Sequence, residues 1–206
     1  MRLPTTDGAG IVRELADAVV ANKAWLSEID GLIGDGDHGV NMAKGFARAA
    51  DRLGEADLQA AFATLGDVLL SEIGGSMGPL YGMMFAAMAE RAQGDALDDA
   101  AFGAMLRAGL AEVEATGGAK VGDKTLVDCL APAVAAFEAE AGFGRALAAM
   151  AEAAERGRDA TVDLQARLGR SARLGERSRG VLDAGAASCC LLLQTLAAGA
   201  ARRLVA

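Results

Sequence analysis

Residues 11–46, IVRELADAVVANKAWLSEIDGLIGDGDHGVNMAKGF, carry the pattern that decides the fold. Apolar side chains recur there at the spacing of one helical face, at Ile11, Leu15, Val19 and Leu26. This period predicts a helix over about 11–29. A loop rich in glycine and aspartate interrupts the period, which resumes after His38 and continues to about residue 53. The stretch therefore predicts two helices joined by a polar loop.

The same helical period repeats through the rest of the chain, and no stretch alternates convincingly with the period of two that a strand requires. We predict six further helices, over about 57–73, from about 79, and over about 98–115, 124–140, 143–168 and 183–203. Hydrophobic residues make up 52% of the 206 residues and only 3 are proline, which excludes a disordered chain. The sequence therefore predicts one all-α domain over 1–206, built of eight antiparallel helices.

The predicted connections are of two kinds. Those after the second, fourth and sixth helices are plain, whereas those after the first, third, fifth and seventh are rich in glycine and charge. The four conspicuous segments are DGLIGDGDHG, GGSMG, TGGAKVGD and GRSARLGERSRGVLDAG. Because alternate connections of an up-and-down helical array lie at the same end, these four loops should converge at one pole. A functional site is expected there.

Composition narrows the class of protein. The formal net charge of −8 and the pI near 4.7 argue against a nucleic-acid partner, which would favour a basic surface. The three cysteines, two of them adjacent in an apolar run, suit buried thiols in a reducing compartment. The N-terminus has no apolar signal region, and no stretch is expected to reach the roughly 18 apolar residues of a membrane span. These features predict a cytoplasmic protein. Trp25 occupies an apolar helical position and is predicted to lie in the core.

The first conspicuous loop carries three aspartates, Asp30, Asp35 and Asp37, which we predict to be metal ligands. Two carboxylates separated by one glycine repel each other unless a cation lies between them, and carboxylate oxygens favour Mg²⁺ or Ca²⁺. Three carboxylates with two Mg²⁺ leave a positive charge that a polyphosphate would offset, which favours a nucleotide diphosphate. The alternatives are a solvated Gly/Asp turn and a helix cap at Asp37. The ligand spacing of a calcium EF-hand is missing.

The other polar residues of these loops each have two interpretations. His38, the only histidine, either bonds locally at a helix start or contacts the nucleotide, and Asn41 is either a surface amide or a phosphate contact. GGSMGPL is a glycine turn entering a helix, whose N-terminus can bind phosphate. Asp123 is expected to cap the helix that follows it. The last loop carries four arginines that are either solvated or clamp phosphate or an acidic partner: Arg170, Arg173, Arg177 and Arg179.

Taken as a set, the four loops resemble those of the nucleotide-binding L subunit of dihydroxyacetone kinase, in its phosphotransferase-system-dependent bacterial form. The resemblance extends across nearly the whole chain and rests on DGLIGDGDHGVNMAKGF, GGSMGPLYG, VGDKTLVD and GRSARLGERSRGVLDAGAAS. It implies an up-and-down barrel of eight antiparallel helices with the nucleotide at one rim. Met77 stands where the family usually has a hydroxyl residue, and Ala184 where it commonly has proline. Backbone amides or Ser76 would therefore contact the phosphate.

The resemblance also implies the roles of individual residues. Asp30, Asp35 and Asp37 would hold two Mg²⁺ that bridge the phosphates of ADP or ATP. The nucleotide site would be formed by His38, Gly39, Val40, Asn41, Ser76, Met77, Gly117, Leu126, Arg170, Asp183, Ala184 and Gly185. The chain shows no general base for the substrate, and transfer would depend on the metal ligands and Arg170.

By the same resemblance, the chain is a phosphotransferase subunit that passes a phosphoryl group to dihydroxyacetone, or to a related short ketose, held on a separate K subunit. A phosphohistidine-bearing carrier subunit would rephosphorylate ADP that stays bound. One alternative is an ATP-dependent kinase subunit whose nucleotide exchanges in each cycle. Another is a non-catalytic, ADP-loaded regulator that binds a transcription regulator. Neither a nucleic acid nor a membrane is expected as a partner.

Overall fold

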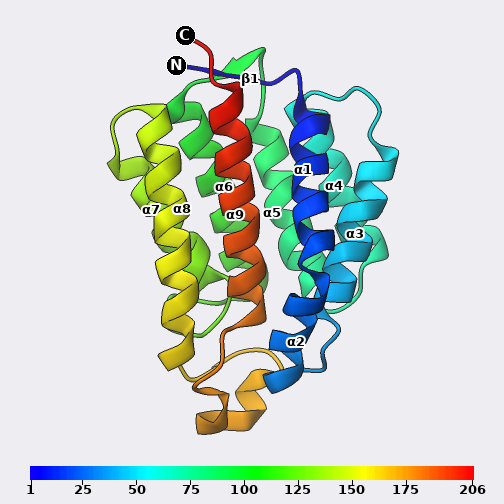
Figure 1. Cartoon of the computed structure of the whole chain (residues 1–206), viewed down its shortest axis with the longest axis vertical. Coiled ribbons are helices and arrows are strands. Elements are labelled where there is room, and N and C mark those ends of the chain that lie inside the picture. Colours follow the sequence, from blue (N-terminus) through cyan, green and yellow to red (C-terminus); the bar gives the residue numbers. More distant parts are fainter.

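The computed structural model describes residues 1–206, and most of them lie in nine α-helices (Figure 1). The helices are α1 Gly8–Ala21, α2 Lys23–Ile33, α3 His38–Arg52, α4 Leu58–Glu72, α5 Met77–Arg91, α6 Asp99–Gly117, α7 Val127–Ala139, α8 Phe143–Ala160 and α9 Ala184–Arg203. Two 3₁₀ helices, η1 Thr161–Asp163 and η2 Ser171–Ser178, lie between α8 and α9. Two short strands, β1 Leu3–Pro4 and β2 Ala96–Leu97, form an antiparallel pair.

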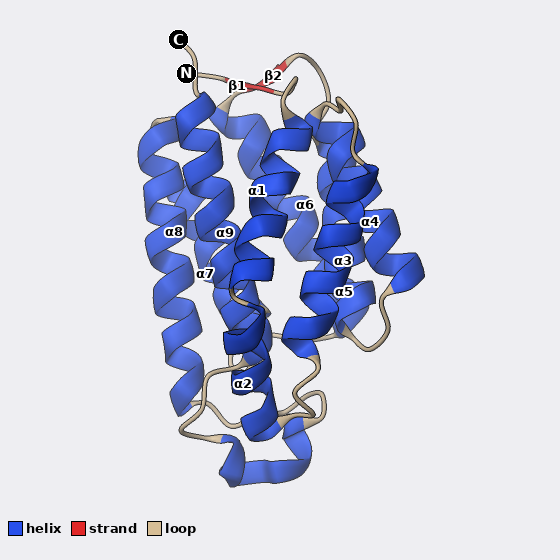
Figure 2. Cartoon of the chain, turned by 45° about the vertical axis from the view of Figure 1, so that its right-hand side comes forward, coloured by secondary structure: helices blue, strands red, loops and turns tan.

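Eight of the helices close into a ring. From α3 to α9 each helix packs against the next, and α1 packs against both α3 and α9, which closes the barrel. Consecutive helices of this ring run in opposite directions (Figures 1 and 2). The prediction of an all-α, up-and-down barrel of eight antiparallel helices is confirmed. The strand pair was not predicted, because two residues are too few to show a period.

The first predicted helix is in fact two helices, α1 and α2, separated at Asn22. The side-chain amide of Asn22 donates to the carbonyl of Ala18 at 2.8 Å, and its backbone has left the helical region, with φ −101° and ψ 8°. Such side-chain bonds to the backbone compete with the helical ones. The continuation, α2, lies outside the ring and packs on α3 and α9. The prediction that Trp25 is a core residue was wrong, because α2 leaves this side chain exposed.

A single large cluster of buried apolar side chains fills the ring and draws on all eight of its helices. A smaller cluster pairs Leu26 and Ile29 of α2 with Ala184 and Ala187 at the start of α9. It fixes the end of α2 beside the beginning of α9. α9 is long and apolar enough to cross a membrane, which the sequence analysis did not anticipate, but 67% of its apolar window is buried inside the barrel. That burial is what a core helix shows.

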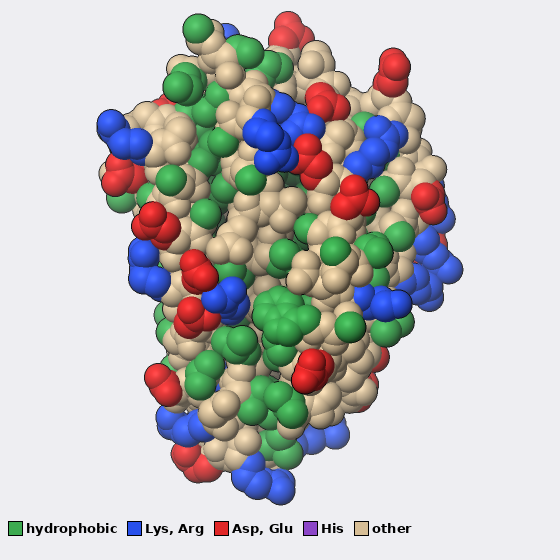
Figure 3. Space-filling model, in the orientation of Figure 1, with side chains coloured by type: hydrophobic (Ala, Val, Ile, Leu, Met, Phe, Trp, Pro, Cys, Tyr) green, Lys and Arg blue, Asp and Glu red, His purple; other side chains and the backbone are tan.

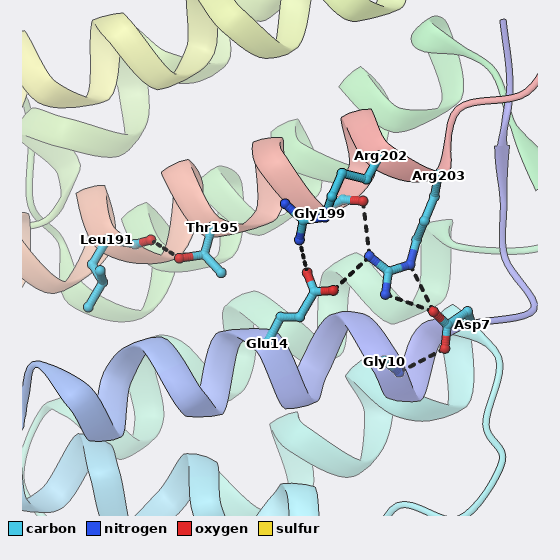
Figure 4. Close-up of polar contacts among 8 residues, drawn as sticks. All are labelled: Asp7, Gly10, Glu14, Leu191, Thr195, Gly199, Arg202 and Arg203. Carbon is cyan, nitrogen blue, oxygen red and sulfur yellow. Dashed lines mark hydrogen bonds and ion pairs between the residues drawn. The ribbon is translucent and has the colours of Figure 1, made fainter.

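The two poles of the barrel differ. At one pole the plain connections lie with both chain termini and the β1–β2 pair (Figure 2). There Arg203 of α9 binds the Asp7 carboxylate at 2.7 and 2.8 Å and Glu14 of α1 at 3.0 Å (Figure 4). These ion pairs close the ring between its first and last helices. The four conspicuous loops lie at the other pole, together with the segment 161–183 (Figure 1).

Candidate functional site

One cavity of about 600 Å³ lies at the pole of the conspicuous loops. Its walls come from all four of them: from residues 30–41, 74–81, 116–126 and 168–185. The prediction that these loops converge is therefore confirmed. The cavity also reaches into the barrel between the helix ends, where Val113 of α6 contributes to its wall.

Three carboxylates gather on one side of this cavity. Oxygen atoms of Asp30, at the end of α2, and of Asp35 and Asp37, in the loop before α3, all lie within 4.8 Å of one another. The glycines between them permit this arrangement. A Cβ on Gly34 would lie 2.3 Å from the Asp30 carboxylate, and Gly36 has a φ of +78°, which other residues rarely adopt. Three converging carboxylates fit a hard divalent cation, since each supplies an oxygen ligand.

Asp37 occupies the N-cap position of α3, but its side chain makes no capping hydrogen bond. At the starts of α4, α6 and α9, by contrast, the cap carboxylates of Asp57, Asp98 and Asp183 each accept a backbone N–H at 2.8 Å. The alternative interpretation of Asp37 as a helix cap is therefore wrong. Its carboxylate remains free to act with the other two aspartates.

The start of α5 forms a second wall of the cavity. Ser76 is its N-cap residue and also makes no side-chain capping bond, while Met77, the first helical residue, is buried against the cavity. Gly78 must be glycine, because a Cβ there would lie 2.1 Å from the carbonyl oxygen of Ile73. An uncapped helix start presents unpaired N–H groups and a partial positive charge, which favour phosphate.

The arginines of the last loop separate into two groups. Arg170 and Arg173 line the cavity, and Arg170 forms an ion pair with Asp35. Arg179 instead binds Glu176 at 2.7 Å, and Arg177 does not reach the cavity wall. Two arginines therefore share the cavity with the three carboxylates, and guanidinium groups are suited to binding an anion there.

A buried lysine anchors the segment that carries these arginines. Lys124 is only 1% exposed and adopts a φ of +61°, the single left-handed non-glycine residue in the chain. Its ammonium donates to the carbonyls of Thr161 and Val181, which lie at the two ends of the segment 161–183. Burial lowers the pKa of Lys124, although the charge of Asp183 opposes this shift. Lys124 thereby holds both ends of the arginine segment against the loop before α7.

Asp128 holds the loop before α7 in place, because its buried carboxylate accepts the N–H groups of Gly122 and Thr125 at 2.5 and 2.8 Å.

Asp123 was expected to cap the next helix, and that expectation was wrong. α7 begins only at Val127, and the Asp123 carboxylate accepts the N–H of Lys120 at 2.8 Å instead.

His38 stands between the carboxylates and the barrel interior. Its backbone N–H lies 3.3 Å from an oxygen of Asp30, and its ring Nε2 lies 2.9 Å from the hydroxyl of Ser188. Burial lowers the pKa of His38, while the negative charge of Asp30 partly offsets that effect. The ring is therefore held as a neutral imidazole at the edge of the cavity.

The carboxyl group of Asp183, which lines the cavity, should make the stability of the protein depend on pH. Burial raises the pKa of its carboxyl from 3.8 to about 6, against the opposing effects of its capping bond to the Ala186 N–H and of Lys124. The folded chain thus binds a proton more tightly than the unfolded chain. This group's contribution to stability should therefore fall as the pH rises from about 4 to about 6, and stay low above that range.

Asp183→Asn should keep the cap but remove this ionisation. The free energy of unfolding of the variant, relative to the unchanged protein, should rise by up to about 3 kcal/mol between pH 4 and pH 7.5. Urea unfolding at both pH values measures the difference. A difference that is the same at both pH values would contradict the raised pKa.

Thirteen of the fifteen residues predicted for the site line the cavity. They are Asp30, Asp35, Asp37, His38, Asn41, Ser76, Met77, Gly117, Leu126, Arg170, Asp183, Ala184 and Gly185. Gly39 and Val40 do not. Gly39 packs under α2, where a Cβ would lie 2.1 Å from the carbonyl oxygen of Lys23, and the Val40 side chain is exposed. Both residues can offer only their backbone amides at the start of α3.

Tyr81, Ser188 and the anchoring role of Lys124 escaped the sequence analysis. Tyr81 and Ser188 lie inside apolar helical stretches, where the helical period marks them as core. One signal was available, since Tyr81 is the only tyrosine of a chain with a single histidine. A lone phenol in a core otherwise built of aliphatic side chains and phenylalanine needs a polar partner.

Several known proteins share much of this chain's sequence. Residues 32–198 match the DAK2 domain. Over 188 residues the chain is 36% identical to a protein of Listeria innocua, PEP-dependent dihydroxyacetone kinase 1, ADP-binding subunit DhaL, covering 90% of this chain and 91% of that one. It is 34% identical to the ADP-binding subunit DhaL of the PEP-dependent dihydroxyacetone kinase of Escherichia coli, covering 97% and 99% of the two chains.

The fold is also similar to a solved structure. The crystal structure of the dihydroxyacetone kinase from C. freundii in complex with AMP-PNP and Mg²⁺ superposes with a TM-score of 0.71 at 28% identity. The match covers 93% of this chain and 33% of that longer one.

Proposed function

The chain belongs to the DAK2-domain family, among the ADP-binding subunits of dihydroxyacetone kinase, which are phosphotransferases, and we propose how its cavity serves that activity. In our proposal, residues 1–206 act as one domain in the cytoplasm. The cavity holds ADP or ATP with two Mg²⁺. The phosphoryl group passes to dihydroxyacetone, or a related short ketose, on a separate K subunit, and a phosphohistidine carrier subunit regenerates the bound nucleotide.

The observation that carries this proposal is the free carboxylate of Asp37. It occupies a capping position without capping the helix, and it converges within 4.8 Å on Asp30 and Asp35. Like charges this close are unfavourable unless a cation lies among them. The donor set is therefore one that Mg²⁺ fits. When bound there, Mg²⁺ would neutralise the phosphate charge that develops during transfer.

The chain's own residues bind and orient the nucleotide. The uncapped starts of α3 and α5 and the Ser76 hydroxyl would contact the phosphates, together with Arg170 and Arg173, which line the same cavity. Gly117 and Leu126 form the part of the wall that would meet the base. Phosphoryl transfer depends mainly on such positioning and charge neutralisation. No residue of the cavity is assigned as a base for the substrate hydroxyl, so the K subunit is proposed to supply it.

A separate acceptor protein must meet the mouth of this cavity. Leu32, Val121 and Leu168 expose 64%, 65% and 37% of their surface. Leu168 forms part of the cavity wall, and Leu32 and Val121 lie within two residues of the wall in the sequence. Apolar side chains also gather on the lower half of the face in Figure 3, where Figure 1 shows α2, and basic side chains occupy the lower tip. We assign the mouth, with its apolar rim, as the surface that docks the K subunit.

The test is a transfer assay with purified chain, its K subunit, dihydroxyacetone and the phosphocarrier with its donors, without free nucleotide. We expect several moles of triose phosphate per mole of bound ADP. Product that forms only when free ATP is added would support the alternative of an exchangeable nucleotide. Absence of product under both conditions, with the K subunit bound, would contradict a kinase role and leave the regulatory alternative.

A further inference from the structure

The only histidine of the chain ends a line of hydroxyl groups that runs into the barrel core. Nε2 of His38 lies 2.9 Å from the hydroxyl oxygen of Ser188, and that oxygen lies 2.7 Å from the hydroxyl of Tyr81. Ser188 is 0% exposed and Tyr81 1%. His38 belongs to α3, Ser188 to α9 and Tyr81 to α5, so three helices contribute one residue each.

The hydroxyl groups of this line can donate to more than one acceptor. The two hydroxyls also lie near the carbonyl of Gly185, at 3.1 Å from Tyr81 and 3.0 Å from Ser188. That carbonyl belongs to the first turn of α9, where it also accepts the regular helical N–H. It therefore does not need a hydroxyl donor. Tyr81 remains a donor, because burial, followed by the charge of Cys189, raises its pKa well above the ordinary value.

At the ring nitrogen, two arrangements of the proton satisfy the contact with Ser188, and each is compatible with the other contacts. In one, Tyr81 donates to Ser188 and Ser188 donates to Nε2 of His38, so that the ring proton is on Nδ1. In the other, Nε2 donates to Ser188, Ser188 donates to the Gly185 carbonyl, and Nδ1 carries only a lone pair. Nδ1 has no partner within the protein, and His38 lines the cavity. A lone pair facing phosphate oxygens would be repelled, whereas an N–H would bind them.

We propose that Ser188 and Tyr81 are positioning residues that orient His38 and place its ring proton on Nδ1, toward the phosphates of the nucleotide. The hydrogen bond at one ring nitrogen sets which nitrogen carries the proton. This inference rests on the proposed function for the identity of the phosphate ligand. The tautomer itself is a property of the protein without any ligand.

The test is nitrogen-15 NMR of the imidazole in the nucleotide-free chain, where a single histidine gives a single pair of ring signals. We expect a protonated Nδ1 and an unprotonated Nε2. Ser188→Ala should move the proton to Nε2 in a large share of the molecules. Tyr81→Phe, which removes one oxygen from a packed ring, should produce a smaller shift in the same direction.

Thr195→Ala is the matched control. Thr195 lies on the same helix, seven residues beyond Ser188, and its hydroxyl donates only to the carbonyl of Leu191 at 2.8 Å (Figure 4). Its variant should leave both ring signals unchanged. If Ser188→Ala does not fold, the ring signals of Tyr81→Phe are compared with those of the unchanged protein and of Thr195→Ala instead. A proton on Nε2 in the unchanged protein, or ring signals unaltered in both site variants, would overturn the inference.

A second readout separates this inference from the proposed function. Equilibrium dialysis with Mg²⁺ and ADP should show binding weakened about tenfold by Ser188→Ala, as expected for loss of a well-placed bond to a charged group. The control variant should bind as the unchanged protein does. Absence of ADP binding by the unchanged protein would defeat the proposed function while the NMR result stands. Normal binding with an unaltered tautomer in the site variants would defeat the inference alone.

Discussion

Alanine in place of Asp35 or Asp37 is expected to abolish magnesium-dependent retention of ADP. Each of these carboxylates is exposed to the cavity, and with Asp30 they converge within 4.8 Å. Removing groups that only support a metal ligand already costs about 10–100-fold in affinity, so loss of a ligand should cost at least about 100-fold. Equilibrium dialysis of the purified variants with Mg²⁺ and ADP measures the loss.

The stability of these variants should change little or increase. Removing one of several close negative charges relieves repulsion, and Asp37 makes no capping bond whose loss would cost stability. Asp51→Ala is the control, because Asp51 is an exposed aspartate of α3 remote from the carboxylate cluster. Full ADP retention in both Asp35→Ala and Asp37→Ala would remove these residues from the site.

Lys124→Met should have the second largest effect, on stability as well as on binding. Methionine keeps an unbranched four-atom stem and the cost of the left-handed backbone, so the change removes mainly the ammonium group. The carbonyls of Thr161 and Val181 would lose a charged donor while remaining largely buried, at a cost of about 2–4 kcal/mol in unfolding free energy. Urea unfolding checks this value.

The same variant should also bind ADP about tenfold more weakly, because the segment that carries Arg170 would lose the anchor at both of its ends. Lys120→Met is the control, since Lys120 lies in the same loop but its side chain is exposed. Equal unfolding midpoints for the two variants would show that Lys124 does not anchor the segment.

The period of the apolar residues predicted the ring, because each ring helix buries one face in a common core. The order of the connections predicted which loops meet, since helices that alternate in direction leave no other arrangement. The loop sequence placed Asp30, Asp35 and Asp37 close together, and their oxygen atoms do converge within 4.8 Å, because the glycines between them let the backbone bend.

Other features depend on contacts between distant residues, which the local period does not contain. The break at Asn22 follows from one side-chain bond to the backbone, and the exposure of Trp25 follows from where that break directs α2. The partners of Lys124 lie 37 and 57 residues away in the chain. Ser188 and Tyr81 are 107 residues apart and meet only when the ring closes.

In our proposal, three aspartates at one end of the barrel hold a magnesium–adenine nucleotide. Native mass spectrometry of the chain, purified with Mg²⁺ and without added nucleotide, would detect this complex. We predict a mass equal to the chain plus one ADP and two Mg²⁺, which a chelator reduces to that of the chain alone. A chain that carries no ligand, even after ADP and Mg²⁺ are added, would show that the aspartates do not hold this nucleotide.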